Sequence, residues 1–208
     1  MSKKTIISLL AFIPFLTGCI NAFGGYESPK YNVLEKSDNI ELREYKKYIV
    51  AEVTLDNSSE DKSNDAFKIL ANYIFGGNKK ASNIAMTSPV EIEQNEGENI
   101  SMTAPVEIEK ESKKTIMRFS MPSKYSLKTI PKPEDEIIKI YEVEGYKAAV
   151  IRFSWFFNEK NFLEKKKVLE NFIKEKNLTA ISEPIKAYYN PPFTLPFLKR
   201  NEIIIKVR

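Results

Sequence analysis

A ten-residue motif occurs in two nearly identical copies in this chain of 208 residues, and the copies begin at positions 84 and 100. The copies are Ile84-Ala-Met-Thr-Ser-Pro-Val-Glu-Ile-Glu93 and Ile100-Ser-Met-Thr-Ala-Pro-Val-Glu-Ile-Glu109. Proline lacks the N–H group that a β-ladder needs, and it holds the preceding residue in extended geometry. We therefore expect each copy to form a β-corner, in which one strand enters Thr-x-Pro and another strand leaves it.

The polar residues between the two copies, 94–99, predict a turn. A repeated corner has a structural role first, so we expect its apolar side chains to pack into a core. These side chains are Met86, Val90, Met102 and Val106.

Apolar residues follow strand and helix patterns along the rest of the chain. Short apolar bursts in residues 31–55 predict two or three strands. Helical spacing in residues 66–74 predicts a first helix, with Ser63 as its N-cap and Gly76-Gly77 as its stop. An apolar stripe among charges predicts a second helix between the N-cap Asn158 and the stop Asn177.

Further strands are expected at residues 115–121, 137–143, 146–153, 185–189 and 203–207. The order of strands, helix, strands, helix and strands indicates an α+β domain with one mixed or antiparallel sheet.

A series of short motifs occurs in order between Tyr31 and Val207. They are Glu41-Leu-Arg-Glu-Tyr45, Tyr73-Ile-Phe-Gly-Gly-Asn78, both Met-Thr-x-Pro-Val copies, Phe119-Ser-Met-Pro122, Ile130-Pro-Lys-Pro133, Tyr189-Asn-Pro-Pro192 and Lys199-Arg-Asn-Glu202. Together they resemble the SOUL haem-binding family. The resemblance implies a distorted β-barrel or curved sheet that carries two long helices, with pseudo-duplicated βαββ halves. It also implies that haem or another tetrapyrrole is the cofactor.

The N-terminal residues 1–18 are typical of a signal peptide, because two lysines precede a mostly apolar run that ends at Leu16. That run is shorter than the ~20 residues that span a bilayer. Leu16-Thr-Gly-Cys19 resembles a bacterial lipobox, in which the cysteine is lipidated and becomes the new N-terminus. Cys19 is the only cysteine, so it has no partner for an intrachain disulfide. The alternatives are an ordinary secretory signal with an incidental cysteine, or a buried thiol.

We therefore divide the chain into a signal peptide (1–18), a lipidated tether (19–30) and a SOUL-like domain (31–208). Two or more acyl chains anchor a protein stably, so the expected location is the bacterial cell envelope. Ile20 follows Cys19 in place of aspartate, which indicates the outer membrane, with the domain facing the periplasm.

Charge gives no sign of a nucleic-acid partner. Without the signal peptide the chain keeps 30 basic and 28 acidic side chains. The most basic stretch, 160–176, is interleaved with glutamates and predicts the solvated face of a helix. A nucleic-acid site needs a clustered basic face.

The chain contains no histidine. This excludes a Ser-His-Asp triad, a Cys-His pair, an HExxH zinc site and histidine-ligated haem. We therefore assign no catalytic residue and leave enzymatic activity open. Haem would have to bind through burial of its apolar ring, without histidine ligation. Methionine and tyrosine also ligate haem iron, and the candidates are Met86, Met102, Met117, Met121, Tyr73, Tyr141 and Tyr189, each of which also suits a core.

The resemblance implies a tetrapyrrole groove along the first helix, with basic side chains near the propionates. On this sequence the groove residues are Phe67, Leu70, Ala71 and Ile74, with Lys199 and Arg200 as charge partners. The apolar set equally suits the core-facing stripe of an amphipathic helix. The polar triplet that begins at Arg200 and ends at Glu202 has two interpretations, a hydrogen-bond cluster with Arg43 or Glu41, or a rim that contacts the ligand.

Three functions follow from these observations. The first is a lipid-anchored envelope protein that holds haem or a related tetrapyrrole in an apolar groove. The second is a pocket protein, hydrolase or sensor for small aromatic ligands, because SOUL domains are similar in fold to effector-binding domains of multidrug-responsive regulators. A large pocket with a buried glutamate and no basic rim would favour it. The third is an envelope interaction scaffold, which a broad exposed apolar patch without a pocket would favour.

Overall fold

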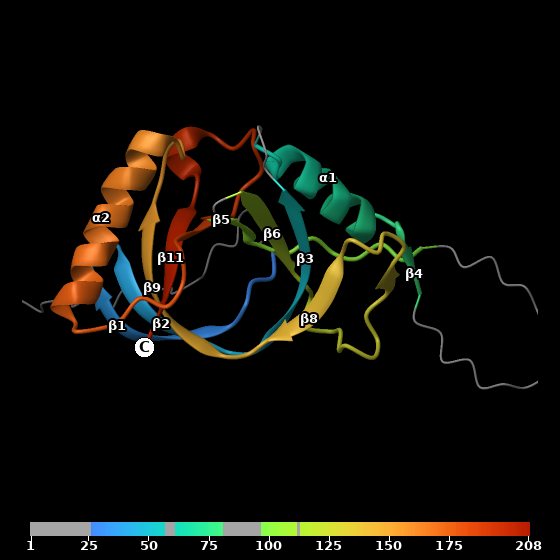
Figure 1. The fold of residues 1–208 in the computed structure, drawn as a ribbon, viewed down its shortest axis with the longest axis horizontal. Helices are drawn as coiled ribbons and strands as arrows, with labels where there is room; N and C mark the ends of the chain where they lie inside the picture. The colour runs from blue at the N-terminus through green and yellow to red at the C-terminus, as the bar shows by residue number, and fades with distance from the viewer. Residues whose placement is uncertain (1–25, 57–60, 81–96, 112) are drawn as a thin grey trace, which may run out of the picture.

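Nine strands form one antiparallel sheet that curls into a half-barrel and carries two helices on its outer face (Figure 1). The computed structural model describes residues 26–56, 61–80, 97–111 and 113–208. The strands are β1 (Tyr31–Ser37), β2 (Ile40–Tyr45), β3 (Tyr48–Asp56), β5 (Val106–Glu111), β6 (Lys114–Ser120), β8 (Lys139–Val143), β9 (Tyr146–Phe153), β10 (Ile185–Tyr188) and β11 (Asn201–Val207). The short strands β4 (Asn78–Lys79) and β7 (Lys132–Pro133) pair separately. The helices are α1 (Ser63–Ile74), α2 (Glu159–Glu175) and the 3-10 turn η1 (Pro196–Leu198).

The sheet order, β1-β2-β9-β11-β10-β5-β6-β3-β8, contains two equivalent halves. β3 leads into α1 and the β5–β6 hairpin, and β9 leads into α2 and the β10–β11 hairpin. The halves meet where β5 pairs with β10, so an approximate two-fold axis passes between these strands. The preceding strands are exchanged, because β2 pairs with β9 and β8 pairs with β3. The predicted α+β fold with pseudo-duplicated βαββ halves is confirmed.

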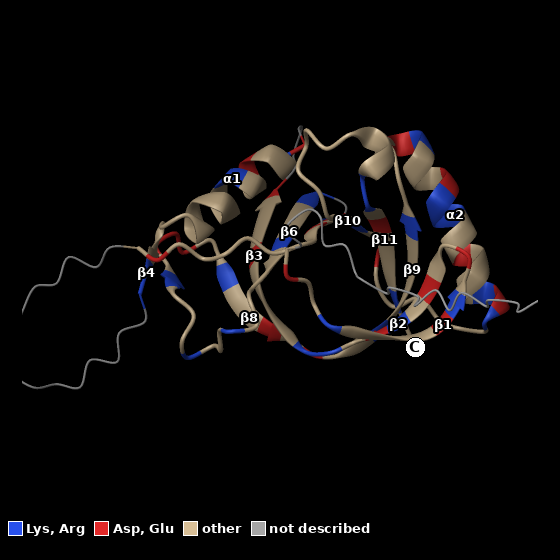
Figure 2. Ribbon diagram, turned by 180° about the vertical axis from the view of Figure 1, so that it is seen from behind, with Lys and Arg blue, Asp and Glu red and all other residues tan. Residues whose placement is uncertain are grey.

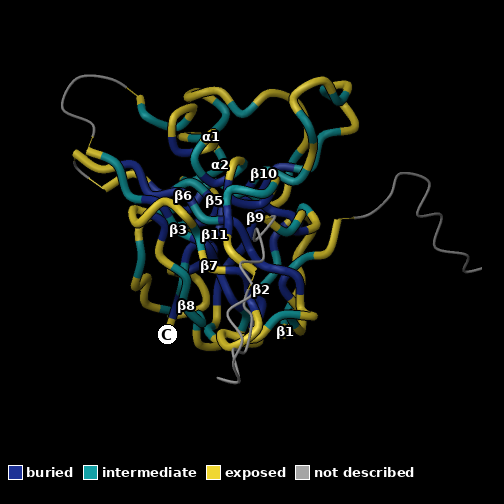
Figure 3. Tube along the Cα trace, turned by 90° about the vertical axis from the view of Figure 1, so that its right-hand side faces the viewer, coloured by how far each residue is buried: buried dark blue, intermediate teal, exposed yellow. Residues whose placement is uncertain are grey.

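Each helix buries one face against the outer surface of the sheet. Leu70, Tyr73 and Ile74 of α1 pack over β3 and β6, and Leu169 and Phe172 of α2 pack over β9 and β11. The strands are therefore the most buried part of the domain, while the loops are exposed (Figure 3). Basic and acidic residues alternate along the outer face of α2 (Figure 2), as predicted for residues 160–176. Within the described ranges, neither helix has the length and apolar character that crossing a bilayer requires.

Local signals predicted the helix ends with one error. Asn158 caps α2, because its side chain accepts the N–H of Asn161 at 2.8 Å. Asn177 follows α2 with a φ of 54°, which confirms it as the stop. Ser63, however, is the first residue of α1 rather than its N-cap. Its N–H and hydroxyl both donate to the Asp61 carboxylate, so Asp61 makes the bonds that a cap would make.

The predicted β-corners are confirmed only in part. The first copy, residues 84–93, lies outside the described residues, as do Met86 and Val90. In the second copy the leaving strand is β5, but residues 100–103 form no entering strand. Instead, the segment pairs at two separate points, through isolated bridges from Asn99 to Phe75 and from Thr103 to Glu27, and the N–H of Ile100 donates to the carbonyl of Ile74 at 2.8 Å. Met102 and Val106 pack against the core under α1, as expected.

Replacing Leu70 with alanine should lower the free energy of unfolding by about 2–5 kcal/mol, because Leu70 is fully buried under α1 and its removal leaves a cavity. Leu163→Ala is the matched control, since Leu163 is a helical leucine that is 54% exposed. We expect it to change the stability by less than about 0.5 kcal/mol. Urea unfolding measures both, and equal losses would contradict this description of the core.

Candidate functional site

Charged and tyrosine side chains gather on the inner face of the half-barrel, away from the helices. On β5, Val106 and Ile108 pack toward α1, so the alternating residues Glu107 and Glu109 face inward. The same alternation turns Glu202 of β11 to the inner face. Four charged residues are buried here: Arg43, Glu107, Glu109 and Glu202.

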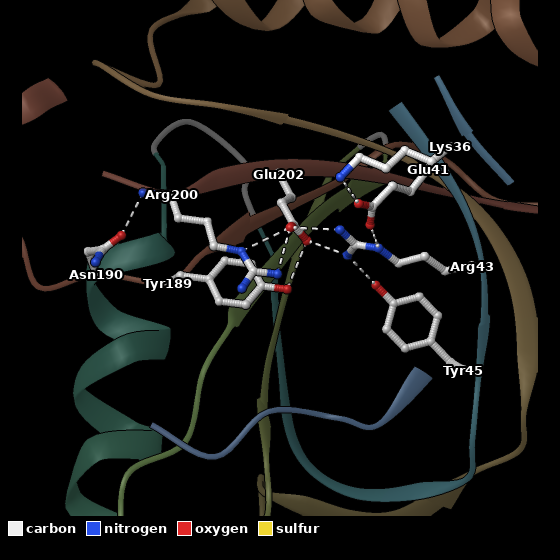
Figure 4. Close-up of polar contacts among 8 residues, drawn as sticks. All are labelled: Lys36, Glu41, Arg43, Tyr45, Tyr189, Asn190, Arg200 and Glu202. Atoms are coloured by element: carbon white, nitrogen blue, oxygen red, sulfur yellow. Dashed lines mark hydrogen bonds and ion pairs between the residues drawn. The ribbon is translucent and has the colours of Figure 1, made fainter. Parts of the chain in front are cut away.

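The centre of one cluster is a bidentate ion pair between Arg43 and Glu202 (Figure 4). The Nη1 and Nη2 atoms of Arg43 donate to the two Glu202 oxygens at 2.8 and 3.0 Å. Arg200 donates to the same carboxylate through Nε at 3.0 Å and Nη2 at 2.8 Å. The hydroxyl of Tyr189 adds another bond at 2.8 Å. Arg43 also donates to Glu41 through Nε, at 2.8 Å.

Electrostatics keep this cluster ionised. Burial alone would raise the pKa of Glu202, but the hydrogen bonds and charges of Arg43 and Arg200 lower it below the ordinary value. Burial alone would lower the pKa of Arg43, and the bonds to Glu202 raise it instead. The interpretation of residues 200–202 as a hydrogen-bond cluster with Arg43 is therefore confirmed.

A second cluster surrounds Arg118 of β6. Its Nε donates to Glu52 at 2.6 Å, and its Nη1 donates to Glu109 at 2.7 Å. The hydroxyl of Tyr141 also donates to Glu52, at 2.6 Å. This cluster joins β3, β5, β6 and β8, so it stabilises the first half of the sheet as the Arg43 cluster stabilises the second.

Glu107 lies between the two clusters, and within the described ranges no hydrogen bond reaches its carboxyl group. Burial raises its pKa, and the charges of Arg118 and Lys206 offset only part of this effect. Tyr48 and Tyr146 begin the equivalent strands β3 and β9, and their hydroxyl oxygens are 3.2 Å apart. Burial raises the pKa of both tyrosines, and the charge of Glu107 raises it further. Glu107 thus lies near these tyrosines, beside the approximate two-fold axis.

A cleft of about 560 Å³ lies between the N-terminal segment 27–30, the β2–β3 turn and the loop that follows β6. Its volume lies in the range of about 300–1,000 Å³ that is usual for ligand pockets. We call it the lysine-rimmed cleft. Its apolar and aromatic lining comes from Tyr48, Ile49, Met121, Tyr125 and Leu127, its lysines are Lys30, Lys46, Lys47 and Lys128, and its acids are Glu27 and Glu142.

The residues predicted for a groove along the first helix lie in different environments. Leu70 and Ile74 are buried in the core, and Ala71 is half-buried. Phe67 is exposed, with its ring 5.6 Å from that of Phe119. Among the described residues, no hydrogen bond, ion pair or ring contact links α1 to the predicted basic partners Lys199 and Arg200. A ligand-binding role for this set stays a prediction.

The predicted basic partners are both engaged elsewhere. Arg200 bonds to Glu202, and its guanidinium lies 3.8 Å from the ring centroid of Tyr189. The ammonium of Lys199 donates to the carbonyl of Pro192 at 3.1 Å.

The candidate iron ligands are also separated. Met117 is buried in the core, and Met102 packs against it. The hydroxyls of Tyr73, Tyr141 and Tyr189 are used in internal hydrogen bonds. Of the predicted methionines and tyrosines that the structure describes, Met121 alone lines the lysine-rimmed cleft. The described residues contain no group of three or more acidic or cysteine side chains that could hold a metal ion.

Replacing Glu202 with glutamine should lower the free energy of unfolding by about 3 kcal/mol near neutral pH, because it removes the bidentate partner of the buried Arg43 and leaves it only the partly exposed Glu41. The difference from the wild type should shrink as the pH falls below 4.5, since a depressed pKa contributes stability that is lost in acid. Glu142→Gln is the control, because its pair with Lys47 is exposed, and such pairs contribute about 1 kcal/mol or less. Urea unfolding across this pH range measures both variants.

Replacing Glu107 with glutamine should have the opposite effect. A carboxyl group whose pKa is raised in the folded state contributes to the free energy of unfolding in full below pH 4.5, and this contribution is lost as the pH rises. The variant should therefore unfold at a higher urea concentration than the wild type at about pH 8, and the two should converge at about pH 4. A variant that is less stable at about pH 8 would show that the ionised carboxylate has a partner.

Comparison with solved structures supports the fold. The structure is similar to the C-terminal domain of EcmrR, with a TM-score of 0.56 and 9% identity over 86% of this chain and 98% of that chain. An uncharacterized conserved protein from Listeria innocua has a TM-score of 0.52, and a hydrolase from Listeria innocua has one of 0.50. Both are 9% identical and cover 90% of this chain and 95% of theirs. At this identity the likeness concerns the fold alone.

Sequence comparison gives the family. A search of curated proteins found no match. The profile of the SOUL heme-binding protein family matches residues 26–206, which is nearly the whole described chain. The chain therefore belongs to the SOUL family.

Proposed function

We propose that this protein is a lipid-anchored envelope protein that binds haem or a related tetrapyrrole in the lysine-rimmed cleft, without histidine ligation. The observation that carries the proposal is a cleft with an apolar lining and four lysines in a member of a haem-binding family. A tetrapyrrole with carboxylate side chains has the matching chemistry, an apolar ring with anionic groups at one edge.

Burial of the ring would supply most of the affinity. Each 100 Å² of apolar surface removed from water contributes about 2.5 kcal/mol. The exposed Leu127 and the half-buried Tyr48 and Tyr125 offer this apolar contact surface, alongside the nearly buried Ile49 and Met121. The lysines are exposed, and an exposed ion pair contributes about 1 kcal/mol or less. The rim would therefore orient the ligand more than it retains it.

The charge of the cleft favours an anionic ligand over a cationic one. Four lysines face two glutamates, and both glutamates are already engaged. Glu27 accepts the N–H of Ser123 at 3.0 Å, and Glu142 pairs with Lys47 at 3.2 Å. The buried Glu107 is not among the residues that line the cleft. This is the reverse of what a pocket for cationic aromatic ligands requires, so the tetrapyrrole is the better candidate.

The residues of the cleft suit haem without histidine. Met121 is buried, and the half-buried Tyr125 lines the same cleft. Both residue types serve as axial ligands of haem iron, and bound haem would supply a redox-active or ligand-binding iron centre. We propose Met121 as the residue to test for iron contact.

The lipid anchor is the second part of the proposal. Cys19 would carry the lipid, and the domain would face the periplasm from the outer membrane. Glu27 and Lys30 are already bonded to the domain, through backbone hydrogen bonds to Ala104 and Lys46. The predicted tether, 19–30, would therefore end in contact with the domain at these two residues.

A haemin titration of the full chain, followed through the Soret band, tests the cleft. The double variant Lys46→Glu with Lys128→Glu should weaken binding about tenfold, which corresponds to about 1.4 kcal/mol. Lys160→Glu is the control, because Lys160 lies on α2, outside the cleft. Met121→Leu should change the Soret spectrum if the thioether contacts the iron, since leucine keeps the volume but removes the sulfur.

Phe67→Ala and Arg200→Ala distinguish the cleft from the predicted groove on α1. Binding that weakens with these two changes but not with the lysine changes would move the ligand to α1. Weak binding that never saturates would contradict tetrapyrrole binding at either place.

A further inference from the structure

Two neighbouring loops present an exposed apolar surface that the proposed function does not use. The loops join β9 to α2 and β10 to β11. They lie side by side, because the N–H of Trp155 donates to the carbonyl of Pro196 at 2.8 Å. Six large apolar side chains on them are more than half exposed, and we call them the apolar loop patch: Trp155, Phe156, Phe193, Leu195, Phe197 and Leu198.

The backbone under this patch is braced rather than loose. Trp155 has a φ of 75°, which is unfavourable for a bulky residue and persists only when its surroundings hold it. Besides the bond to Pro196, the carbonyl of Trp155 accepts the side-chain amide of Asn201 at 2.8 Å. Pro196 also begins the turn η1. The fold therefore holds aromatic side chains in water, and a rigid exposed apolar surface of this kind indicates an apolar partner.

The charges around the patch indicate what kind of partner it binds. Residues 154–160 and 190–199 contain two cations, Lys160 and Lys199, and one acid, Glu159, which lies 3.9 Å from Lys186. The cation Lys199 lies 5.8 Å from the ring centroid of Phe156. Tryptophan and phenylalanine with lysines at the margin are the composition of protein surfaces that enter the headgroup region of a bilayer. A two-fold dimer through this patch would instead bring two cationic margins together.

We propose that the apolar loop patch docks on a lipid surface, with its aromatic side chains in the headgroup region. This goes beyond the proposed anchor, because the tether joins the domain at Glu27 and Lys30, which line the cleft, and so does not itself bring the patch to the bilayer. The patch lies on the helix-bearing side of the domain, and the β2–β3 turn of the lysine-rimmed cleft lies on the opposite side (Figure 1). Docking therefore leaves the cleft open to water.

Trp155 is the only tryptophan in the chain, so its fluorescence reports on the patch alone. The full chain is reconstituted into vesicles of phosphatidylethanolamine and phosphatidylglycerol, with or without brominated acyl chains. We expect a blue-shifted Trp155 emission that brominated lipid quenches at least about twofold. Phe193→Asp with Phe197→Asp should abolish the quenching. Phe75→Asp with Ile181→Asp, two exposed apolar residues outside the patch, should keep it.

Vesicle flotation separates this proposal from the lipid anchor. A chain that floats with the vesicles but keeps an unquenched Trp155 overturns docking and leaves the anchor in place. Flotation that is lost in the Phe193→Asp with Phe197→Asp variant overturns the anchor and supports the patch. A blue shift that depends on protein concentration without vesicles would assign the patch to a second copy of the chain and overturn docking.

Discussion

The ion pair between Arg43 and Glu202 fastens the exchanged strand β2 to the second half of the sheet. β2 leads into the first half and β11 ends the second, and the two strands are separated by β9. The pair reaches across β9 inside the half-barrel, with both side chains almost fully buried. Two buried charges cost several kcal/mol each to desolvate. The pair therefore stabilises the fold only because further hydrogen bonds occupy the remaining donors of Arg43 and acceptors of Glu202. Arg200, Tyr189 and Glu41 supply those bonds. This polar contact therefore adds to the backbone pairing of β2 with β9, which places the exchanged strand.

Because these buried groups bond to one another, the charged groups that a ligand can reach lie at the edge of the half-barrel. Arg200 was the natural partner for a propionate, but its guanidinium is bonded to Glu202 and stacked on Tyr189. A ligand would have to break these contacts to use it. The lysines of the cleft are exposed and reach water, so they can meet an anion without leaving a buried carboxylate unpaired. This difference is why we place the ligand at the cleft.

Local patterns predicted the elements of this fold but not the site. Both helices and the strands from Tyr31 to Asp56 follow from apolar spacing and end signals, because those signals act within a few residues. The entering strand before Pro105 was predicted wrongly, because the segment bridges two distant segments, at Phe75 and at Glu27, in place of one continuous partner strand. The inward-facing Glu107 and Glu109 could have been recognised from their alternation with Val106 and Ile108. The cleft could not, since residues near 30, 47, 103 and 125 meet only in the folded sheet.

Glu107 and Glu202 are both buried glutamates on the inner face, but they affect the stability of the fold in opposite ways. Burial acts to raise the pKa of both. The pKa of Glu107 is raised overall, whereas the hydrogen bonds and charges around Glu202 lower its pKa overall. The difference lies in the donors, since Glu202 accepts from two arginines and a tyrosine, while Glu107 senses Arg118 and Lys206 only through their charge. A carboxylate with three donors stabilises the folded state near neutral pH, whereas one without them opposes it. The ionised Glu107 near the two-fold axis therefore destabilises the folded state, and the Arg43 and Arg118 clusters on either side must outweigh this effect.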